Sequence, residues 1–569
     1  MLKHPTAPQN RHLLERDDLN RMKGSRNSLN QKGIATMMTA FSMLMLVPIV
    51  GLALDGGLAY LVKTRLSAAA DSAALAAARG LSGGSTVSLA QAQATALATT
   101  FFNGNFPAGY LNTDTAVRSI NTVFTLGTGT SGNGIPNGVL QVQVTASVRS
   151  STYFMKWLGY SDLPVNVTGT ATRRQLVMTL VLDKSASMGS RTTAVGNTSV
   201  GIGTTSCDAM VYSSIQFLGY FSPYDYIGVL PFDYTAYATY PPTTNYAAAG
   251  GAAQQIANIN CGNNTNTTAA LNLAMTQITN VNLPLANNVI VLFTDGVPNG
   301  VNATFPIRTQ ADTRISSACG GAECAVPVCT TVAGNVSAVI TQTAGFSVNS
   351  GNLGGPFKMF STDGTPSVPG NGCPNSGTDF VQKTLAFIPA ADFFGNATSG
   401  PYDNWLYQVN SHTAPNGTPI TSGNSATKNL GDLWSNYAAT GIGAPSNKFQ
   451  NGPYINRFRT DLANTIGVIS MNTAVNQANA IRGNTVFRPV IHTIYLQGNA
   501  GDPVDRAFLQ LVTNQQTIQP IIYAADAAPY ANGAYDATQQ QGLYLATTST
   551  AALNNLFLQV ASSLLRIAQ

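Results

Sequence analysis

The feature that most restricts the fold of this chain is an uncharged, apolar stretch from Gly33 to Leu54. At about 1.5 Å of rise per residue, a helix over this stretch crosses a hydrocarbon layer roughly 30 Å thick. The alternatives are a buried core helix and a cleaved signal peptide, whose apolar region usually spans only about 7–15 residues. Gly57-Leu58-Ala59 is only a weak candidate for cleavage, so we expect a retained transmembrane helix that binds the membrane through residues 33–54.

The distribution of charge predicts how this helix is oriented. The formal net charge is +5, and the tail before Gly33 supplies +4 of it, because seven basic residues there oppose three acidic ones. Lys and Arg residues that flank a membrane helix are usually found on the cytoplasmic side of the membrane. We therefore expect residues 1–32 to be a cytoplasmic basic tail of a single-pass inner-membrane protein whose C-terminal bulk is periplasmic. The basic residues are Lys3, Arg11, Arg16, Arg21, Lys23, Arg26 and Lys32, and the acidic ones are Glu15, Asp17 and Asp18.

The remainder of the chain is nearly neutral, which argues against nucleic-acid binding. Only 9% of all residues are charged, against roughly 25% in an average soluble protein, and such a polar but uncharged surface is typical of extracytoplasmic bacterial proteins. The motifs HExxH and GxxxxGK[ST] are absent from the sequence, so it offers no usual support for a protease or a P-loop enzyme. We expect no enzymatic activity.

After the apolar stretch, an Ala-rich and Pro-free sequence from Leu58 to Leu81 predicts that the helix continues to Gly80. Its small Ala face favours close packing against another element. The region 33–82 resembles the N-terminal segment of TadE/TadG-like proteins of the Tad (tight adherence, Flp) pilus-assembly system, with Pro48 inside the apolar run, Asp55 after it and the tail AADSAALAAA. Related pseudopilins carry a Glu five residues after the processing Gly, where this chain has Met38; the resemblance thus implies an uncleaved, TadG-type member.

Residues 83–172 are predicted to form a small α+β stalk, rich in β-structure, that acts as a spacer. VLQVQVTASV and LPVNVTGTAT alternate apolar and polar residues, as half-buried strands do, and TYFMKWLGY between them predicts a short helix or loop.

Beyond the stalk, two continuous apolar runs each end in an acid, as buried strands of a parallel sheet can. LVMTLVLD ends at Asp183 and is followed by Ser185 and Ser187, whereas NNVIVLFTDG contains Asp295; Thr265 precedes an amphipathic helix between them. Ligand groups gather at the carboxyl ends of such strands. Carboxylate and hydroxyl oxygens suit a hard divalent cation, so these five residues are the candidate metal ligands.

Each part of this pattern also has a structural explanation: Ser-x-Ser is common in turns, and Thr265 can be a helix N-cap. In their order, however, Asp183, Ser185, Ser187, Thr265 and Asp295 resemble the metal-ion-dependent adhesion site (MIDAS) of von Willebrand factor A (vWA) domains. The resemblance implies Mg2+ (or Mn2+ or Ca2+) as the cofactor. It also implies a carboxylate of a partner protein as a further ligand.

The same resemblance implies the fold class: an α/β protein with a transmembrane helix, the stalk, and a vWA domain built on a mostly parallel, doubly wound, Rossmann-like sheet. YDYIGVLPFDY is similar to a second core strand and VFRPVIHTIYLQG to a later one. The last residues predict an amphipathic helix whose apolar stripe runs from Leu553 to Leu564. We assign 173–300 and 456–569 to the vWA domain and 301–455 to an insert in it, either a lid, a binding subdomain or a disordered loop.

All six cysteines follow the apolar stretch, and an even number in an oxidising compartment favours disulfides. We expect Cys207 to pair with Cys261 in the vWA domain and the other four cysteines to form two disulfides within the insert. Zinc binding is the alternative, although the spacing of these cysteines has no CxxC pair. These four are Cys319, Cys324, Cys329 and Cys373 in the insert.

Taken together, these features predict an inner-membrane-anchored periplasmic vWA protein that binds other Tad pilus-assembly or envelope proteins through its MIDAS. It would act in Tad/Flp pilus assembly or anchoring and in surface adhesion. The alternatives are a vWA adhesin or envelope scaffold unrelated to pili and an enzyme with a catalytic group near Asp295. The identity of the ligand and the oligomeric state do not follow from the sequence.

Overall fold

The structure is a computed structural model that describes residues 31–567, apart from 83, 117, 130, 297, 299, 307–334, 343–356, 362–437, 440–464, 498–505 and 517–534. The basic tail before Gln31, most of the predicted insert and its four cysteines lie outside the described residues. The chain divides into two compact units. Unit 1 comprises residues 1–64, 108–118 and 147–166, and unit 2 comprises residues 65–107, 119–146 and 167–569.

Helix α1 (Gln31–Gly80) is continuous and contains Pro48, and it ends at Gly80 as predicted. The part from Ile34 onward is long and apolar enough to cross a membrane, with a mean hydropathy of 2.1 over its most apolar window. Only 6% of that window is buried, which argues against a core helix. A helix of this length and composition near an N-terminus is a membrane span or a signal sequence.

Unit 1 consists of the apolar half of α1, two short 3-10 helices and the adjoining ends of two long strands. The 3-10 helices are η1 (Tyr110–Asn112) and η2 (Met155–Leu158). Ser151 Oγ donates to the carbonyl of Asn112 at 2.6 Å, and an ion pair of 2.6 Å joins Arg149 to Asp162. The predicted helix or loop at TYFMKWLGY is therefore the single turn η2.

In unit 2, the Ala-rich end of α1 is buried, as its small face predicted. Ala69, Ala73 and Ala77 have no exposed surface. Arg65 Nε donates to the carbonyl of Asn105 at 2.7 Å, and Asn105 Nδ2 donates to Ser72 Oγ at 2.9 Å. Asn105 ends helix α2 (Val87–Asn105), which buries Ala residues four apart along one face. We did not predict α2, because a helix whose buried face consists largely of alanine shows little hydrophobic contrast.

Three strands form a sheet in the order β1-β2-β3, namely β1 (Ser119–Leu126), β2 (Val139–Ser151) and β3 (Asp162–Arg174). Strand β2 alternates buried and more exposed side chains, as its sequence predicted. Gly169 of β3 lies so close to the backbone of Ala70 that an added Cβ would meet it at 2.4 Å, so no larger residue fits there.

The vWA-like part of unit 2 is built on a six-stranded sheet in the order β13-β12-β7-β4-β5-β6. All neighbouring strands are parallel except β6, which is antiparallel to β5. The central strand β4 is buried along its whole length, as expected for a strand covered on both faces. The six strands are β4 (Leu176–Asp183), β5 (Tyr226–Phe232), β6 (Tyr240–Thr243), β7 (Asn287–Thr294), β12 (Val490–Leu496) and β13 (Tyr544–Thr547).

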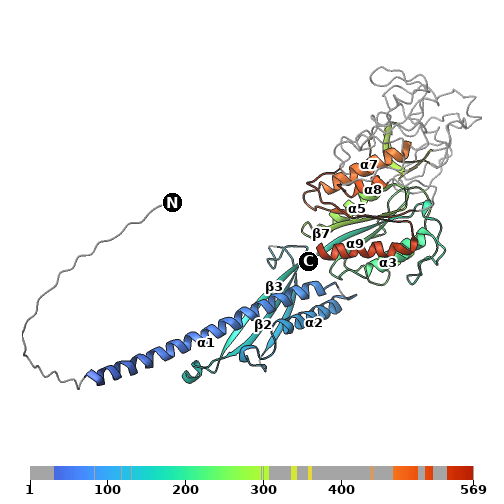
Figure 1. Ribbon diagram of the computed structural model, residues 1–569. Coiled ribbons are helices and arrows are strands. Elements are labelled where there is room, and N and C mark those ends of the chain that lie inside the picture. The colour runs from blue at the N-terminus through green and yellow to red at the C-terminus, as the bar shows by residue number, and fades with distance from the viewer. Residues whose placement is uncertain are drawn as a thin grey trace, which may run out of the picture. The chain divides into compact units, whose positions relative to one another are not determined.

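Helices cover both faces of this sheet (Figure 1). Helices α3 (Ser206–Leu218) and α9 (Leu553–Ile567) lie on one face, and α5 (Thr267–Val281), α7 (Thr465–Arg482) and α8 (Arg506–Val512) lie on the other. The short helix α4 (Ala252–Ala257) packs beside α3. The predicted stripe of α9 is buried: its Phe557 ring lies 5.2 Å from that of Phe217 and 6.1 Å from that of Phe293. The predicted α/β fold with a doubly wound, mostly parallel sheet is confirmed.

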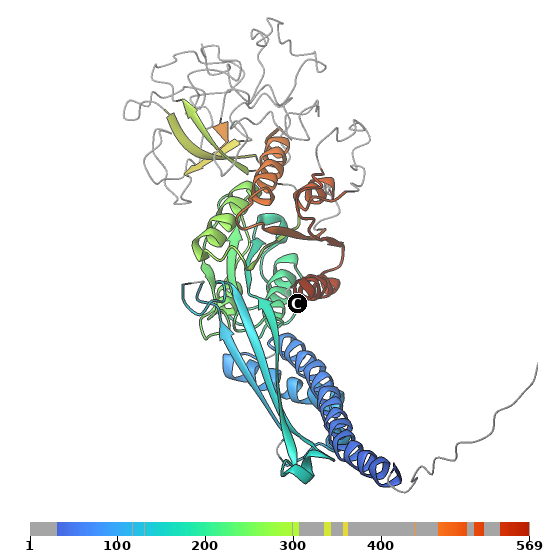
Figure 2. The same ribbon diagram turned by 90° about the vertical axis from the view of Figure 1, so that its left-hand side faces the viewer.

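A second, antiparallel sheet has the order β10-β9-β8-β11 (Figure 2). Its strands are β8 (Gly300–Pro306), β9 (Asn335–Gln342), β10 (Phe357–Ser361) and β11 (Ala438–Ala439). All but the first residue of β8 fall within the range that we predicted to be an insert.

Strand β12 carries a buried histidine, and we expect it to make the stability of the fold depend on pH. His492 is 2% exposed, and its Nδ1 accepts a hydrogen bond of 2.9 Å from the backbone N–H of Leu543. Burial lowers the pKa of His492 to about 4. The unfolded chain therefore takes up this proton first, and acidification from about pH 6.5 to about pH 4 should lower the free energy of unfolding by about 3 kcal/mol through this residue.

Chemical denaturation at a series of pH values checks this expectation against His492→Asn, whose side-chain oxygen can accept the same hydrogen bond without titrating. The stability difference between the two proteins should change over that pH range and be constant above it. A constant difference throughout would show that His492 does not couple folding to protonation.

Candidate metal site at the carboxyl edge of the sheet

The candidate site lies where the central strands of the six-stranded sheet end. Leu182 of β4 pairs with Phe293 of β7, so Asp183 is level with Thr294 on the adjacent strand, and Asp295 follows immediately. Neighbouring strands are about 4.8 Å apart, which brings the two carboxylates to one edge. Strand β4 has β7 on one side and β5 on the other, and the connections leave in opposite directions there, as at ligand sites of open α/β sheets.

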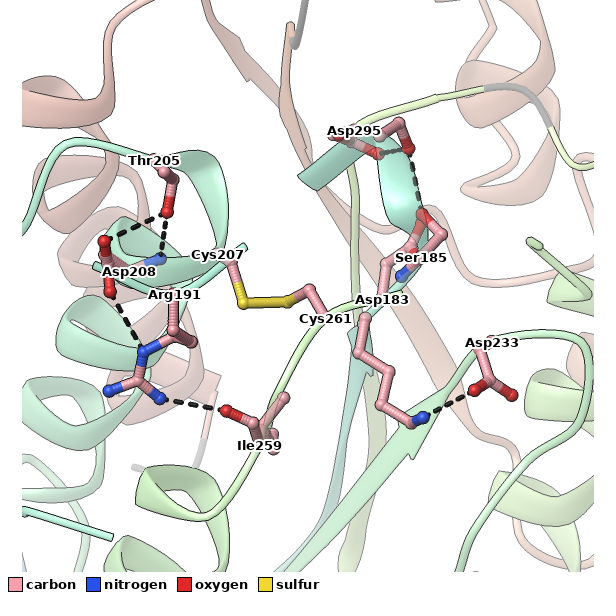
Figure 3. Close-up of a disulfide and its surroundings, with 12 residues drawn as sticks. Asp183, Ser185, Arg191, Thr205, Cys207, Asp208, Asp233, Ile259, Cys261 and Asp295 are labelled. Carbon is pink, nitrogen blue, oxygen red and sulfur yellow. Dashed lines mark hydrogen bonds and ion pairs between the residues drawn. A yellow bond between two sulfur atoms is a disulfide. The ribbon is translucent and has the colours of Figure 1, made fainter. Parts of the chain in front are cut away.

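Four of the five predicted ligands are joined by a chain of hydrogen bonds (Figure 3). The backbone N–H of Ser185 donates to Asp183 Oδ1 at 2.8 Å, and the hydroxyl oxygens of Ser185 and Ser187 are 2.9 Å apart. Ser187 Oγ then donates to Asp295 Oδ1 at 2.7 Å. The oxygen side chains of two distant sequence segments are thus gathered within one small volume.

The fifth residue, Thr265, lies in a loop that is bound to the same site by its backbone. The N–H of Gly262 donates to the carbonyl of Lys184 at 2.7 Å, and the N–H of Ala186 donates to the carbonyl of Asn263 at 2.8 Å. Thr265 itself is 5% exposed. The alternative role that we gave it, as the N-cap of the following helix, is wrong: Asn266 caps α5 by accepting from the N–H of Ala269 at 3.1 Å.

Asp183 is a fully buried acid without a compensating cation in the part of the chain that the structure describes. Thr294 Oγ1 donates to its Oδ2 at 2.6 Å. Burial raises the pKa of Asp183 to about 6, and the negative charge of Asp233 contributes to this rise. The hydrogen bonds from Thr294 and Ser185 act in the opposite direction and lower the pKa. A buried carboxylate whose ionised form is disfavoured in this way would be stabilised by a bound cation.

Sequence reasoning missed two residues of this edge. Asp233 follows β5 and is completely buried, but its charge is balanced: Lys184 Nζ lies 2.5 Å from its Oδ2, and Tyr237 and Asn263 also donate to it. Its position directly after an apolar run, as with Asp183 and Asp295, was the signal that could have revealed it. Thr294 is the other missed residue, and no pattern in the sequence indicated its bond to Asp183.

The loop after Ser187 is held by a second buried acid, Asp208, in the first turn of α3 (Figure 3). Its carboxylate accepts hydrogen bonds from the backbone and hydroxyl groups of Thr192 and Thr193 and forms an ion pair of 3.0 Å with Arg191. Burial by itself raises the pKa of Asp208, but these hydrogen bonds hold that pKa well below its ordinary value. The neighbouring residue forms the predicted Cys207–Cys261 disulfide, which joins α3 to the Thr265 loop.

The predicted ligand side chains at this edge of the sheet offer only oxygen atoms, as the predicted Mg2+ site requires. Asp183 and Asp295 supply carboxylate oxygens and Ser185 and Ser187 supply hydroxyl oxygens, a combination that suits Mg2+ better than Zn2+. Within the described ranges, no group of three or more His, Cys, Asp or Glu side chains could hold a metal ion, so a site here needs the serine hydroxyl oxygens as ligands beside the two carboxylates. The residues therefore fit a hard divalent cation held by carboxylate and hydroxyl groups.

A mostly parallel sheet in this order, with an Asp-x-Ser-x-Ser loop after its central strand and an acid after the neighbouring strand, defines a domain of the von Willebrand factor A class. Residues 178–297 match the family model of the von Willebrand factor type A domain. Residues 33–80 match a second family model, described as Flp pilus-assembly TadE/G-like. The chain thus combines a TadE/G-like segment with a vWA domain, which is the architecture that its sequence resembles.

Among the solved structures that are similar to the chain are three from pili. The PilB minor pilin from Streptococcus sanguinis is 11% identical over 79% of each chain, with a TM-score of 0.31. The vWF domain of the type V pili tip protein Mfa5 from Porphyromonas gingivalis is 14% identical, covering 70% of this chain and 98% of that one, with a TM-score of 0.29. The pilus adhesin RrgA from Streptococcus pneumoniae is 10% identical, covering 78% and 49%, with a TM-score of 0.28. Such low values say nothing about what this chain binds. No curated protein matches the sequence closely enough to count as a relative.

Proposed function

We propose that this pilus-related vWA protein is anchored in the inner membrane by α1 and binds a partner in the Tad/Flp pilus machinery through a MIDAS formed by Asp183, Ser185, Ser187, Thr265 and Asp295. The observation that carries the proposal is the hydrogen-bonded chain from Asp183 through both serines to Asp295 at the carboxyl edge of the sheet. The TadE/G-like match at residues 33–80 supports the connection with pili.

The role of the site would be to hold a partner, not to catalyse a reaction. Mg2+ favours about six oxygen ligands, and an ion that these residues hold through one or two carboxylates keeps positions open for water or a further ligand. A carboxylate of a partner protein suits such a position, because its oxygens are hard ligands of the kind that Mg2+ prefers. The same chemistry would allow Mn2+ or Ca2+, and it requires no catalytic group.

The membrane part of the proposal rests on α1 and on the charge of the preceding tail. The exposed apolar half of α1 would span the inner membrane once, with residues 1–32 cytoplasmic and the vWA domain periplasmic. We further propose the domain division 33–82, 83–172, 173–300 with 456–569, and 301–455 as the insert. A reporter enzyme that is active only in the periplasm, fused to the C-terminus, should be active, whereas an N-terminal fusion should be inactive.

The connection with pili can be tested in the bacterium that encodes this chain. Deletion of the gene should reduce the number of surface pili, wild-type protein should restore them, and Asp183→Asn should fail to restore them while accumulating in the membrane to the same level. Normal piliation in the deletion strain, together with lost surface attachment, would instead support a vWA adhesin or scaffold unrelated to pili.

A further inference from the structure

In unit 1, the turn that joins β2 to β3 exposes an unusual number of large apolar side chains. We call residues 153–160 the tip. Trp157 is 90% exposed and Leu158 is 69% exposed, and three further aromatic residues of the tip are at least 40% exposed. Exposed apolar groups that gather in one place mark a surface that meets a partner or a membrane. The three further aromatic residues are Tyr153, Phe154 and Tyr160.

The tip is attached to α1 by a single buried carboxylate. Asp55 is 2% exposed and accepts hydrogen bonds from three successive backbone N–H groups of the tip: those of Tyr153 and Phe154 at 2.9 Å and that of Met155 at 2.7 Å. Three donors on one ionised acceptor fix the tip in position and orientation. The hydrogen bonds come from the start of η2, so the turn itself is held in place.

A glycine in the apolar run provides the second point of attachment. The ring of Phe154 lies against Gly51, where an added Cβ would meet Phe154 Cγ at 2.5 Å. Next to this contact, a groove of about 300 Å³ is lined by Val47, Pro48 and Leu52 of α1 and by Trp157 and Leu158 of the tip. The tip therefore lies alongside the apolar run and not beyond its end.

The position of these contacts along α1 sets the depth of the tip. Pro48 precedes Asp55 by seven residues, which corresponds to about 10 Å along a helix. Other apolar side chains in this part of α1, among them Leu46 and Ile49, are themselves more than half exposed. The apolar surface of the tip is therefore continuous with the surface that α1 would present to lipid.

We propose that the tip is a membrane-inserted wedge, with Trp157 and Leu158 buried in the periplasmic leaflet of the bilayer that α1 crosses. This inference rests on the proposed membrane anchoring of α1. Trp and Tyr favour the boundary between headgroups and acyl chains, which matches the composition of the tip. The exposed Lys156 in the same turn can extend its ammonium group to anionic headgroups. The wedge would fix how deeply the stalk is seated on the membrane.

Depth-dependent quenching of Trp157 fluorescence tests the wedge directly. The chain has three tryptophans, and Trp405→Phe with Trp434→Phe leaves Trp157 as the only tryptophan, whose emission is excited selectively at the long-wavelength edge of the absorption band. The full-length protein is reconstituted in vesicles of phosphatidylethanolamine and phosphatidylglycerol that contain a phospholipid brominated on its acyl chain. We expect loss of most of the Trp157 emission in brominated vesicles and a blue-shifted spectrum in unbrominated ones.

Two variants distinguish attachment of the tip from attachment of the helix. Asp55→Ala removes the acceptor of three hydrogen bonds and should abolish most of the quenching, while the protein stays in the membrane after carbonate extraction. Asp71→Ala, which removes an exposed acid from the same helix, should leave the quenching unchanged.

Each other outcome overturns a defined part of the account. If the protein with the wild-type tip resisted carbonate extraction but its Trp157 emission was not quenched, the wedge would be ruled out and the anchor left intact. The same result together with cross-linking of Trp157-region cysteine variants between two chains would assign the tip to self-association. Release of the wild-type protein by carbonate would reject the membrane anchor itself, and the wedge with it.

Discussion

Replacing Asp183 by Asn is expected to abolish the stabilisation that Mg2+ gives to the wild-type protein and, at neutral pH, to make the ion-free protein more stable. Both effects have one physical cause. Asp183 is fully buried, and no cation of the described residues balances its charge. Removing that charge should raise the free energy of unfolding of the ion-free protein by on the order of 1 kcal/mol. It also removes the ligand that the cation needs.

Thermal unfolding of the full-length protein, with Mg2+ or with a chelator, measures both effects. For the wild type, a concentration of Mg2+ at about 100 times the dissociation constant should add about 2.7 kcal/mol to the free energy of unfolding. For Asp183→Asn the two curves should coincide. Asparagine can keep the local structure, because its oxygen can accept from the N–H of Ser185 and its amide can donate to Thr294.

Asp225→Asn is the matched control, since Asp225 is also completely buried but pairs with Arg173 and bonds to Leu176 at the opposite end of β4. This variant should be less stable than the wild type, because it leaves the Arg173 charge unbalanced, and it should still gain stability from Mg2+. An equal gain from Mg2+ in wild type and Asp183→Asn would refute the metal site.

Removal of the Cys207–Cys261 disulfide is expected to have the second large effect. The two cysteines are 54 residues apart in sequence. For a loop of that length, the chain-entropy model predicts that removing the bond lowers the free energy of unfolding by about 4 kcal/mol. Mg2+ binding should also become weaker. Cys261 directly precedes the loop that carries Thr265, and the backbone of this loop forms hydrogen bonds with Lys184 and Ala186. Denaturation of Cys207→Ala/Cys261→Ala against the oxidised wild type measures the difference.

The remaining four cysteines require a control in the same experiment. A reductant should destabilise the wild type by more than it destabilises the double variant, and the excess reports the Cys207–Cys261 bond alone. If reductant affected both proteins equally, the bond would contribute nothing to the stability of the folded domain.

Local patterns in the sequence were sufficient to predict most of the elements. Strand β4 is apolar at every position because both faces of a central parallel strand are covered, and helix α9 has a stripe because one face packs on the sheet. Helix α1 ends at Gly80 as its composition predicted. In contrast, α2 was missed because a largely alanine face gives almost no periodic signal.

The candidate site was only partly visible in the sequence. Asp183, Ser185, Ser187 and Asp295 are brought together as predicted, although their binding of a metal stays a prediction. The balancing of Asp233 by Lys184 did not follow from the sequence, since both residues occur in patterns that are common in turns. The capping of α5 by Asn266 instead of Thr265 did not follow from the sequence either, because both residue types are favourable N-caps.

By itself, the sequence determined where the chain is apolar, which strands are buried and which acids follow them, because side-chain periodicity and composition act over a few residues. The tertiary structure alone decided which distant groups meet: Thr294 with Asp183, Lys184 with Asp233, and the tip with Asp55. The reason is that a buried charge is stabilised or destabilised by whatever lies within a few ångströms of it, and strand order, not sequence distance, sets those neighbours.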